Sequence, residues 1–152
     1  MASNRHLGRI IALQTLYEFE FREQCGDKEV SLDDVLSRNL ERYADTVEDT
    51  SFVKKLVNGV IAQREKLDEI LQPIAPEWPI DQIARVDRTI LRMAMFELKE
   101  CADIVPPKVA INEAVELAKA FGSDNSSKFI NGVLGTAYRT LIEDSADASA
   151  KV

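Results

Sequence analysis

The chain has 152 residues, of which 45% are hydrophobic and 30% are charged, the balance of one soluble globular domain with its own core. Its net charge of −7 argues against a surface that binds nucleic acid over a broad area, because such binding requires many Lys and Arg contacts to phosphate. Any RNA site is therefore expected to be local, and to be strengthened by a basic protein partner docked on the acidic surface.

The N-terminal segment does not have the pattern of a targeting signal. Arg5 and Arg9 precede an apolar stretch that Gln14, Glu18 and Glu20 soon interrupt, so neither a signal peptide nor a membrane span is expected. We therefore expect a cytoplasmic protein with no membrane partner.

The residues that carry catalysis or bind metals are sparse. Cys25 and Cys101 are isolated, so neither a disulfide framework nor a zinc site is indicated, and His6 has no carboxylate or cysteine at ligand spacing. No phosphate-binding loop, zinc-protease motif or nucleophile elbow is present. We expect no catalytic residues, no metal and no cofactor.

The first two predicted helices have clear ends. Apolar residues at helical spacing predict a helix from Arg5 to about Glu23 that ends near Gly26. Ser31 to Asp34 resembles a capping box with Asp in the Glu position, which predicts the start of a second amphipathic helix. That helix carries its apolar face on Leu32, Val35, Leu36, Leu40 and Tyr43.

The middle of the chain continues in helices. The acidic stretch from Asp45 to Asp49 is predicted to be a turn, and apolar spacing then predicts one long helix from about Ser51 to Leu71. All five prolines lie beyond it and mark breaks in the helical pattern. Asp81 is expected to cap a short helical segment that leads into a helix from Val86 to Glu100.

The stretch from Val105 to Gly135 predicts two helices joined by a polar turn. Pro107 fits a first-turn position, and Gly122 is expected to end the first helix in a left-handed conformation. Cap-forming residues from Ser123 to Ser126 then precede a second apolar face. A single domain is expected over residues 1–144, followed by a disordered tail over 145–152, which has no periodic apolar face.

The start of that last helix could bind an anion. Its unpaired N–H groups would lie beside the hydroxyls of Ser126 and Ser127, the ammonium group of Lys128 and the ring of Phe129, a set that suits a phosphate and a stacked base. The same residues also fit purely structural roles as caps, a solvated cation and a core aromatic ring. Spacing leaves both interpretations open.

Cations in the first helical turn are a second unusual feature. Arg5, His6 and Arg9 oppose the helix dipole, and Arg5 and Arg9 repel each other at a spacing of four residues. Either an external anion or neighbouring acidic side chains would relieve both effects. If these residues and the turn from Ser123 to Phe129 converge, a single-stranded RNA could contact both.

Three segments in order carry a resemblance to a known family. They are ALQTLYEFEF at 12–21, VDRTILRMAMFEL at 86–98 and VPPKVAINEAVELAKAFGSDNSSKFINGVLG at 105–135. They resemble the signature regions of the NusB family of bacterial transcription antitermination factors. The resemblance implies a compact all-α fold of about seven helices in two packed subdomains, and a role without catalysis. It also implies binding to the boxA element of ribosomal RNA leaders as a heterodimer with NusE, a small-subunit ribosomal protein, within an RNA polymerase antitermination complex with other Nus factors.

Residues are assigned by matching this sequence to the family motifs. The RNA-facing residues would be Arg5, His6, Arg9, Ser123, Asp124, Asn125, Ser126, Lys128 and Phe129. The partner-facing residues would be Tyr17, Phe21, Asp87, Arg88 and Glu97, although Tyr17 equally fits the core. Where relatives often carry a denser arginine run, this chain reads Arg-His-Leu-Gly-Arg, which implies that RNA binding needs the partner.

Two other interpretations stay open. A protein-only adaptor or homodimer would bury the basic residues at its interface and exclude RNA. An RNA-recognition domain like the one that precedes ribosomal RNA cytosine methyltransferases would require the chain to be a fragment, because no cofactor-binding domain follows.

Overall fold

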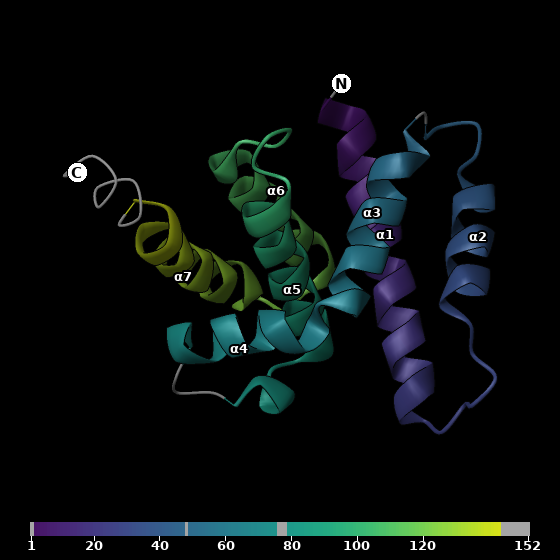
Figure 1. The fold of residues 1–152 in the computed structure, drawn as a ribbon, viewed down its shortest axis with the longest axis horizontal. Coiled ribbons are helices and arrows are strands. Elements are labelled where there is room, and N and C mark those ends of the chain that lie inside the picture. The colour runs from purple at the N-terminus through teal and green to yellow at the C-terminus, as the bar shows by residue number, and fades with distance from the viewer. Residues whose placement is uncertain (1, 48, 76–78, 144–152) are drawn as a thin grey trace. The chain divides into compact units, whose positions relative to one another are not determined.

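The computed structural model describes residues 2–47, 49–75 and 79–143, and within these ranges the regular structure is all helical (Figure 1). The described residues form seven α-helices: α1 (Ala2–Gln24), α2 (Leu32–Arg42), α3 (Thr50–Ala62), α4 (Arg64–Ile74), α5 (Arg85–Glu100), α6 (Pro107–Phe121) and α7 (Ser126–Tyr138). A 3₁₀-helix spans Ile80–Gln82 and a π-helical turn spans Arg139–Glu143. The all-α class expected from the sequence is confirmed. The tail expected over 145–152 lies outside the described residues.

The chain forms two compact units, Met1–Gln63 and Arg64–Val152. None of the described helices is both long enough and apolar enough to cross a membrane. Within the same ranges, no group of three or more His, Cys, Asp or Glu side chains is placed to hold a metal ion.

In the first unit, α1 packs against α2 and α3. A Cβ atom added to Gly8 of α1 would lie 3.0 Å from Cγ2 of Val53, so the absence of a side chain lets α3 approach closely there. The buried apolar side chains of this unit include Ile11 and Leu16 of α1, Val35 and Leu36 of α2, and Val53, Leu56, Val57 and Val60 of α3.

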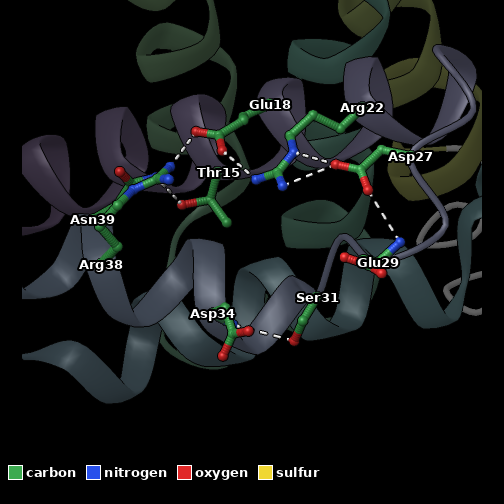
Figure 2. A network of polar contacts seen from close by, with 9 residues as sticks. All are labelled: Thr15, Glu18, Arg22, Asp27, Glu29, Ser31, Asp34, Arg38 and Asn39. Atoms are coloured by element: carbon green, nitrogen blue, oxygen red, sulfur yellow. Dashed lines mark hydrogen bonds and ion pairs between the residues drawn. The ribbon is translucent and has the colours of Figure 1, made fainter.

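The connection between α1 and α2 is held by polar contacts (Figure 2). The carboxylate of Glu18 accepts from Arg22 (3.1 Å) and from Arg38 of α2. Arg22 also donates to Asp27 (2.9 Å), and this bond holds the pKa of Asp27 below its ordinary value. Gly26 lies inside the connection with φ 86, a left-handed conformation that L side chains disfavour.

The predicted start of α2 is confirmed. The Ser31 hydroxyl accepts a hydrogen bond from the backbone N–H of Asp34 (3.3 Å), as the capping-box pattern predicts. The start of α3 is capped in the same way by Asp49, whose side chain accepts from the backbone N–H of Phe52 (3.3 Å).

The long helix expected from Ser51 to Leu71 is wrong. The chain ends α3 at Ala62, passes through Gln63 with φ −109 and ψ 14, and starts α4 at Arg64. The apolar spacing did not indicate this break, because Val60 and Leu67 are seven residues apart and would share one face of a continuous helix. Neither glycine nor proline marks Gln63, which is also the last residue of the first unit.

In the second unit, α5 is buried along its length from Arg88 to Leu98 and packs against α4, α6 and α7. Arg92 of α5 binds Asp68 of α4 through two hydrogen bonds of 2.8 and 2.7 Å. The guanidinium of Arg88 donates to the carbonyls of Ile80, Asp81 and Ile83 in and just after the 3₁₀-helix. The cap expected at Asp81 is wrong, because the 3₁₀-helix Ile80–Gln82 starts after Pro79 with no side-chain cap and Asp81 lies inside it.

The two predicted helices around the polar turn are present as α6 and α7. Pro107 occupies the first position of α6, as predicted. Gly122 ends α6, but its φ of −93 and ψ of −170 are extended rather than left-handed, so the expected conformation is wrong. Glycine is needed there for space, because an added Cβ would lie 2.5 Å from Oγ of Ser126 and 2.8 Å from the carbonyl oxygen of Ala118.

Candidate functional site

The turn between α6 and α7 is closed by hydrogen bonds between its own serines. The backbone N–H of Ser123 donates to Oγ of Ser126 (2.9 Å), and the backbone N–H of Ser126 donates to the carbonyl of Ser123 (3.1 Å). The two hydroxyl oxygens lie 3.1 Å apart. Ser126 is only 2% exposed and fits against Gly122. Ser126 therefore fixes the shape of the turn, while its hydroxyl is turned away from solvent.

The neighbouring side chains of the turn face outward. Ser123, Asp124, Asn125 and Lys128 are exposed, and Phe129 is half-buried beside the buried Ile130. Asn125 precedes α7 but makes no capping hydrogen bond with its side chain. Asn125 therefore does not act as a side-chain cap, whereas Ser126 does have a structural role.

At the start of α1, two cations share one aromatic ring. The Cζ atoms of Arg5 and Arg9 each lie 5.3 Å from the ring centroid of Phe52 in α3. Arg9 is 2% exposed, whereas Arg5 and His6 are half-buried. A ring from the same chain therefore helps to offset the repulsion expected between Arg5 and Arg9.

An acidic group lies at the start of the helix that carries this ring. The hydroxyl of Ser51 and the backbone N–H of Phe52 donate to the carboxylate of Asp49 and hold its pKa below the ordinary value, and the charge of Arg5 adds to this effect. Sequence reasoning missed Phe52 and Asp49, because an aromatic residue in an amphipathic helix and an acidic residue before one are both typical of ordinary helices.

Two aromatic side chains expected to face a partner are exposed on α1. Tyr17 is 36% exposed and Phe21 is 47% exposed, and their spacing of four residues places them on one face of the helix. The alternative of Tyr17 as a wholly buried core residue is excluded by this exposure.

The other three residues expected to face the partner belong to α5 in the second unit. Asp87 is half-buried, whereas Arg88 and Glu97 are buried. Arg88 binds three backbone carbonyls and thereby holds the segment before α5. The expected RNA-facing and partner-facing residues are therefore divided between the two units. Those from Arg5 to Phe21 belong to the first unit, and those from Asp87 to Phe129 belong to the second.

Comparison with known sequences places these features in a family. The sequence model of the NusB family matches residues 6–139. The transcription antitermination protein NusB of Chloroflexus aggregans is 45% identical over 97% of this chain and 95% of its own length. The NusB protein of Roseiflexus castenholzii is 46% identical over 95% of this chain and 99% of its own.

Solved structures agree with the sequence matches. A solved structure of T. maritima NusB superposes with a TM-score of 0.78 at 27% identity, over 90% of this chain and 91% of its own. A structure of the antitermination factors NusB and NusE in complex with dsRNA contains a chain that superposes with a TM-score of 0.77 at 25% identity, over 91% of this chain and 98% of its own. The helical fold and these matches define a protein of the transcription antitermination class. The chain belongs to the NusB family.

Proposed function

We propose that the chain is a transcription antitermination factor that binds boxA-type single-stranded RNA of ribosomal RNA leaders together with NusE and so supports processive elongation by RNA polymerase. The match at 45% identity across 97% of the chain carries this proposal. The protein acts in the cytoplasm as an adaptor rather than as an enzyme. The solved structure of the antitermination factors NusB and NusE in complex with dsRNA supports NusE and RNA as the two ligands.

In this proposal, the RNA contacts come from both units of the chain. Arg5 is half-buried and contacts a phosphate, whereas Arg9 is 2% exposed and adds its charge without a direct contact. Lys128 adds a cation at the exposed turn, and Phe129 offers part of its ring for a base to stack on. His6, Ser123, Asp124 and Asn125 supply polar groups for base edges and sugars. Ser126 contributes by fixing the turn, because its own hydroxyl is buried.

NusE is proposed to dock on the exposed rings of Tyr17 and Phe21, since aromatic residues provide much of the energy of protein interfaces. Asp87 supplies an acidic group for a basic partner, which fits the net charge of −7. Arg88 and Glu97 are buried, so we assign them a structural role in α5 rather than direct contact with NusE.

The test is a titration of boxA-type RNA with and without NusE over a range of salt concentrations. Lys128→Ala is expected to weaken binding by about three- to tenfold and to reduce the salt slope by about one, because one phosphate contact is lost. Lys66→Ala, an equal change of charge at an exposed residue of α4, serves as the control and is expected to leave both values unchanged. An unchanged affinity for Lys128→Ala with NusE present would contradict the assignment of Lys128.

Two further arms separate competing functions. A duplex of the same sequence is expected to bind less tightly than the single strand, since the proposed contacts use an unstacked base. The alternative is a protein-only adaptor or homodimer with an occluded RNA surface. A stable homodimer that excludes RNA at every concentration tested, with NusE present, would establish that alternative and overturn the proposal.

A further inference from the structure

The ring of Phe52 lies near the basic first turn, and the sequence did not indicate this contact. Two guanidinium groups, from Arg5 and Arg9, each lie 5.3 Å from its centroid. Arg5 and Arg9 are one turn apart on α1, and the ring comes from a different helix, α3. A single side chain of α3 therefore contacts both cations.

The position of the ring is itself fixed from two sides. Phe52 is buried, and its backbone N–H donates to the capping carboxylate of Asp49. On the other side, α1 can approach because Gly8 has no side chain: an added Cβ would lie 3.0 Å from Cγ2 of Val53 and 3.9 Å from Cδ1 of Phe52. Gly8 lies between Arg5 and Arg9 in the sequence, so this close approach brings the ring to both of them.

We propose that Phe52 is a positioning residue for RNA binding, which holds the guanidinium groups of Arg5 and Arg9 in place before the RNA arrives. This inference rests on the proposed function. Two like charges four residues apart repel, and a free arginine loses much rotamer freedom when it binds a phosphate. The shared aromatic ring helps to offset the repulsion and orders both side chains in advance, so less entropy is lost on binding.

The competing explanation is that Phe52 only fills the core of the first unit. Three variants separate the two roles. Phe52→Leu keeps an apolar side chain but removes the aromatic ring, and Phe52→Tyr keeps the ring. Val57→Ala weakens the core at a buried residue of α3 five residues further along the chain. All are compared with NusE present, at one low salt concentration and at a temperature where each variant is folded.

Phe52→Leu is expected to lower the affinity for boxA-type RNA by about three- to tenfold, the range that one or two cation–π contacts account for. Phe52→Tyr is expected to restore most of the affinity. Val57→Ala is expected to lower the stability without changing RNA affinity. If Val57→Ala weakens RNA binding as much as Phe52→Leu does, Phe52 acts through stability alone and the inference is overturned.

A double-mutant cycle tests the route of the effect. In an Arg5→Ala/Arg9→Ala background, Phe52→Leu is expected to cause no further loss of RNA affinity, because the groups that it positions are gone. An undiminished loss in that background would overturn the inference. Nuclear magnetic resonance of the free protein adds a measurement that does not involve RNA: the side-chain protons of Arg5 and Arg9 should show ring-current shifts that vanish in Phe52→Leu.

Failure of the inference differs from failure of the proposed function. If the unaltered protein binds RNA with NusE and Phe52→Leu binds it equally well, the positioning role is wrong and the proposed function stands. If the unaltered protein with NusE binds no boxA-type RNA, the proposed function is wrong and the positioning role falls with it.

Discussion

Arg92 of α5 binds the carboxylate of Asp68 on α4 in a bidentate arrangement, with distances of 2.8 Å from Nε to Oδ1 and 2.7 Å from Nη2 to Oδ2. The side chain of Arg92 is 8% exposed, whereas that of Asp68 is 27% exposed. This asymmetry means that the arginine depends on the pair more than the carboxylate does, because water can still reach Asp68.

Loss of the carboxylate should therefore be worse than loss of the arginine. Asp68→Ala is expected to lower the free energy of unfolding by about 2–4 kcal/mol, because a buried guanidinium loses two charge-assisted hydrogen bonds. Arg92→Met, which keeps an apolar stem and leaves a hydrated carboxylate, is expected to cost about 1 kcal/mol. Urea unfolding at neutral pH measures both values, and the reverse order would contradict this account of the pair.

Gly122 is expected to tolerate no side chain. Gly122→Ala should lower the free energy of unfolding by about 1–3 kcal/mol, because the new Cβ would lie 2.5 Å from Oγ of Ser126 and force the turn to move. The matched control is Gly132→Ala on the exposed side of α7, where nothing lies within 4 Å of an added Cβ. That change should stabilise the protein by about 0.5–1 kcal/mol through helix propensity. Changes of the same sign at both glycines would count against a steric cause.

Asp49 should give the stability a dependence on acidic pH. Its folded pKa is lowered by the hydroxyl of Ser51 and the N–H of Phe52. The stabilisation is therefore complete above the ordinary aspartate pKa of about 4 and is lost as the pH falls through the lower folded value. Asp49→Asn keeps a good cap but cannot titrate in this range. Between pH 6 and pH 3, the free energy of unfolding should change less for Asp49→Asn than for the unaltered protein. An equal change in the two proteins would exclude Asp49 as a source of the pH dependence.

The exposed rings of α1 are expected to affect partner binding more than stability. Tyr17→Ala and Phe21→Ala should each weaken NusE binding by about thirtyfold, as for the central residues of protein interfaces. The change in the free energy of unfolding should be small, because both side chains are substantially exposed. Phe121→Ala, at an exposed ring of α6, provides the control. Calorimetric titration with NusE measures the affinity of each variant. Equal affinities for all three variants would show that Tyr17 and Phe21 do not contribute to the interface with NusE.

Local signals in the sequence were sufficient for most helix ends. Ser31 acts through a hydrogen bond to the backbone three residues further on. Pro107 acts through its fixed φ and its missing N–H at the first position of α6, so both roles follow from local sequence. The break at Gln63 does not follow, because the apolar residues on its two sides keep helical spacing while they enter different cores. A pattern of spacing records which residues are buried, and it carries no information on which core buries them.

In the candidate site, too, the sequence predicts local features but not contacts that depend on how the chain packs. The sequence singled out the turn after Gly122, but not the direction of the Ser126 hydroxyl, which depends on how the turn folds back on Ser123. A glycine four residues before a serine that starts a helix was the signal available. The contact of Phe52 with Arg5 and Arg9 requires α1 to lie on α3, and no spacing within either helix encodes that contact.

Gly26 and Gly122 disfavour a side chain for two different reasons, the backbone conformation at Gly26 and the lack of space at Gly122. At Gly26 an added Cβ would meet nothing within 4 Å, but its φ of 86 suits only residues that accept a left-handed backbone. At Gly122 the backbone would suit any residue, and the volume is missing. A library randomised at both positions should therefore be selected by different rules. Asparagine would be the best replacement at position 26 despite its size, whereas at position 122 even the smallest side chain would be rejected.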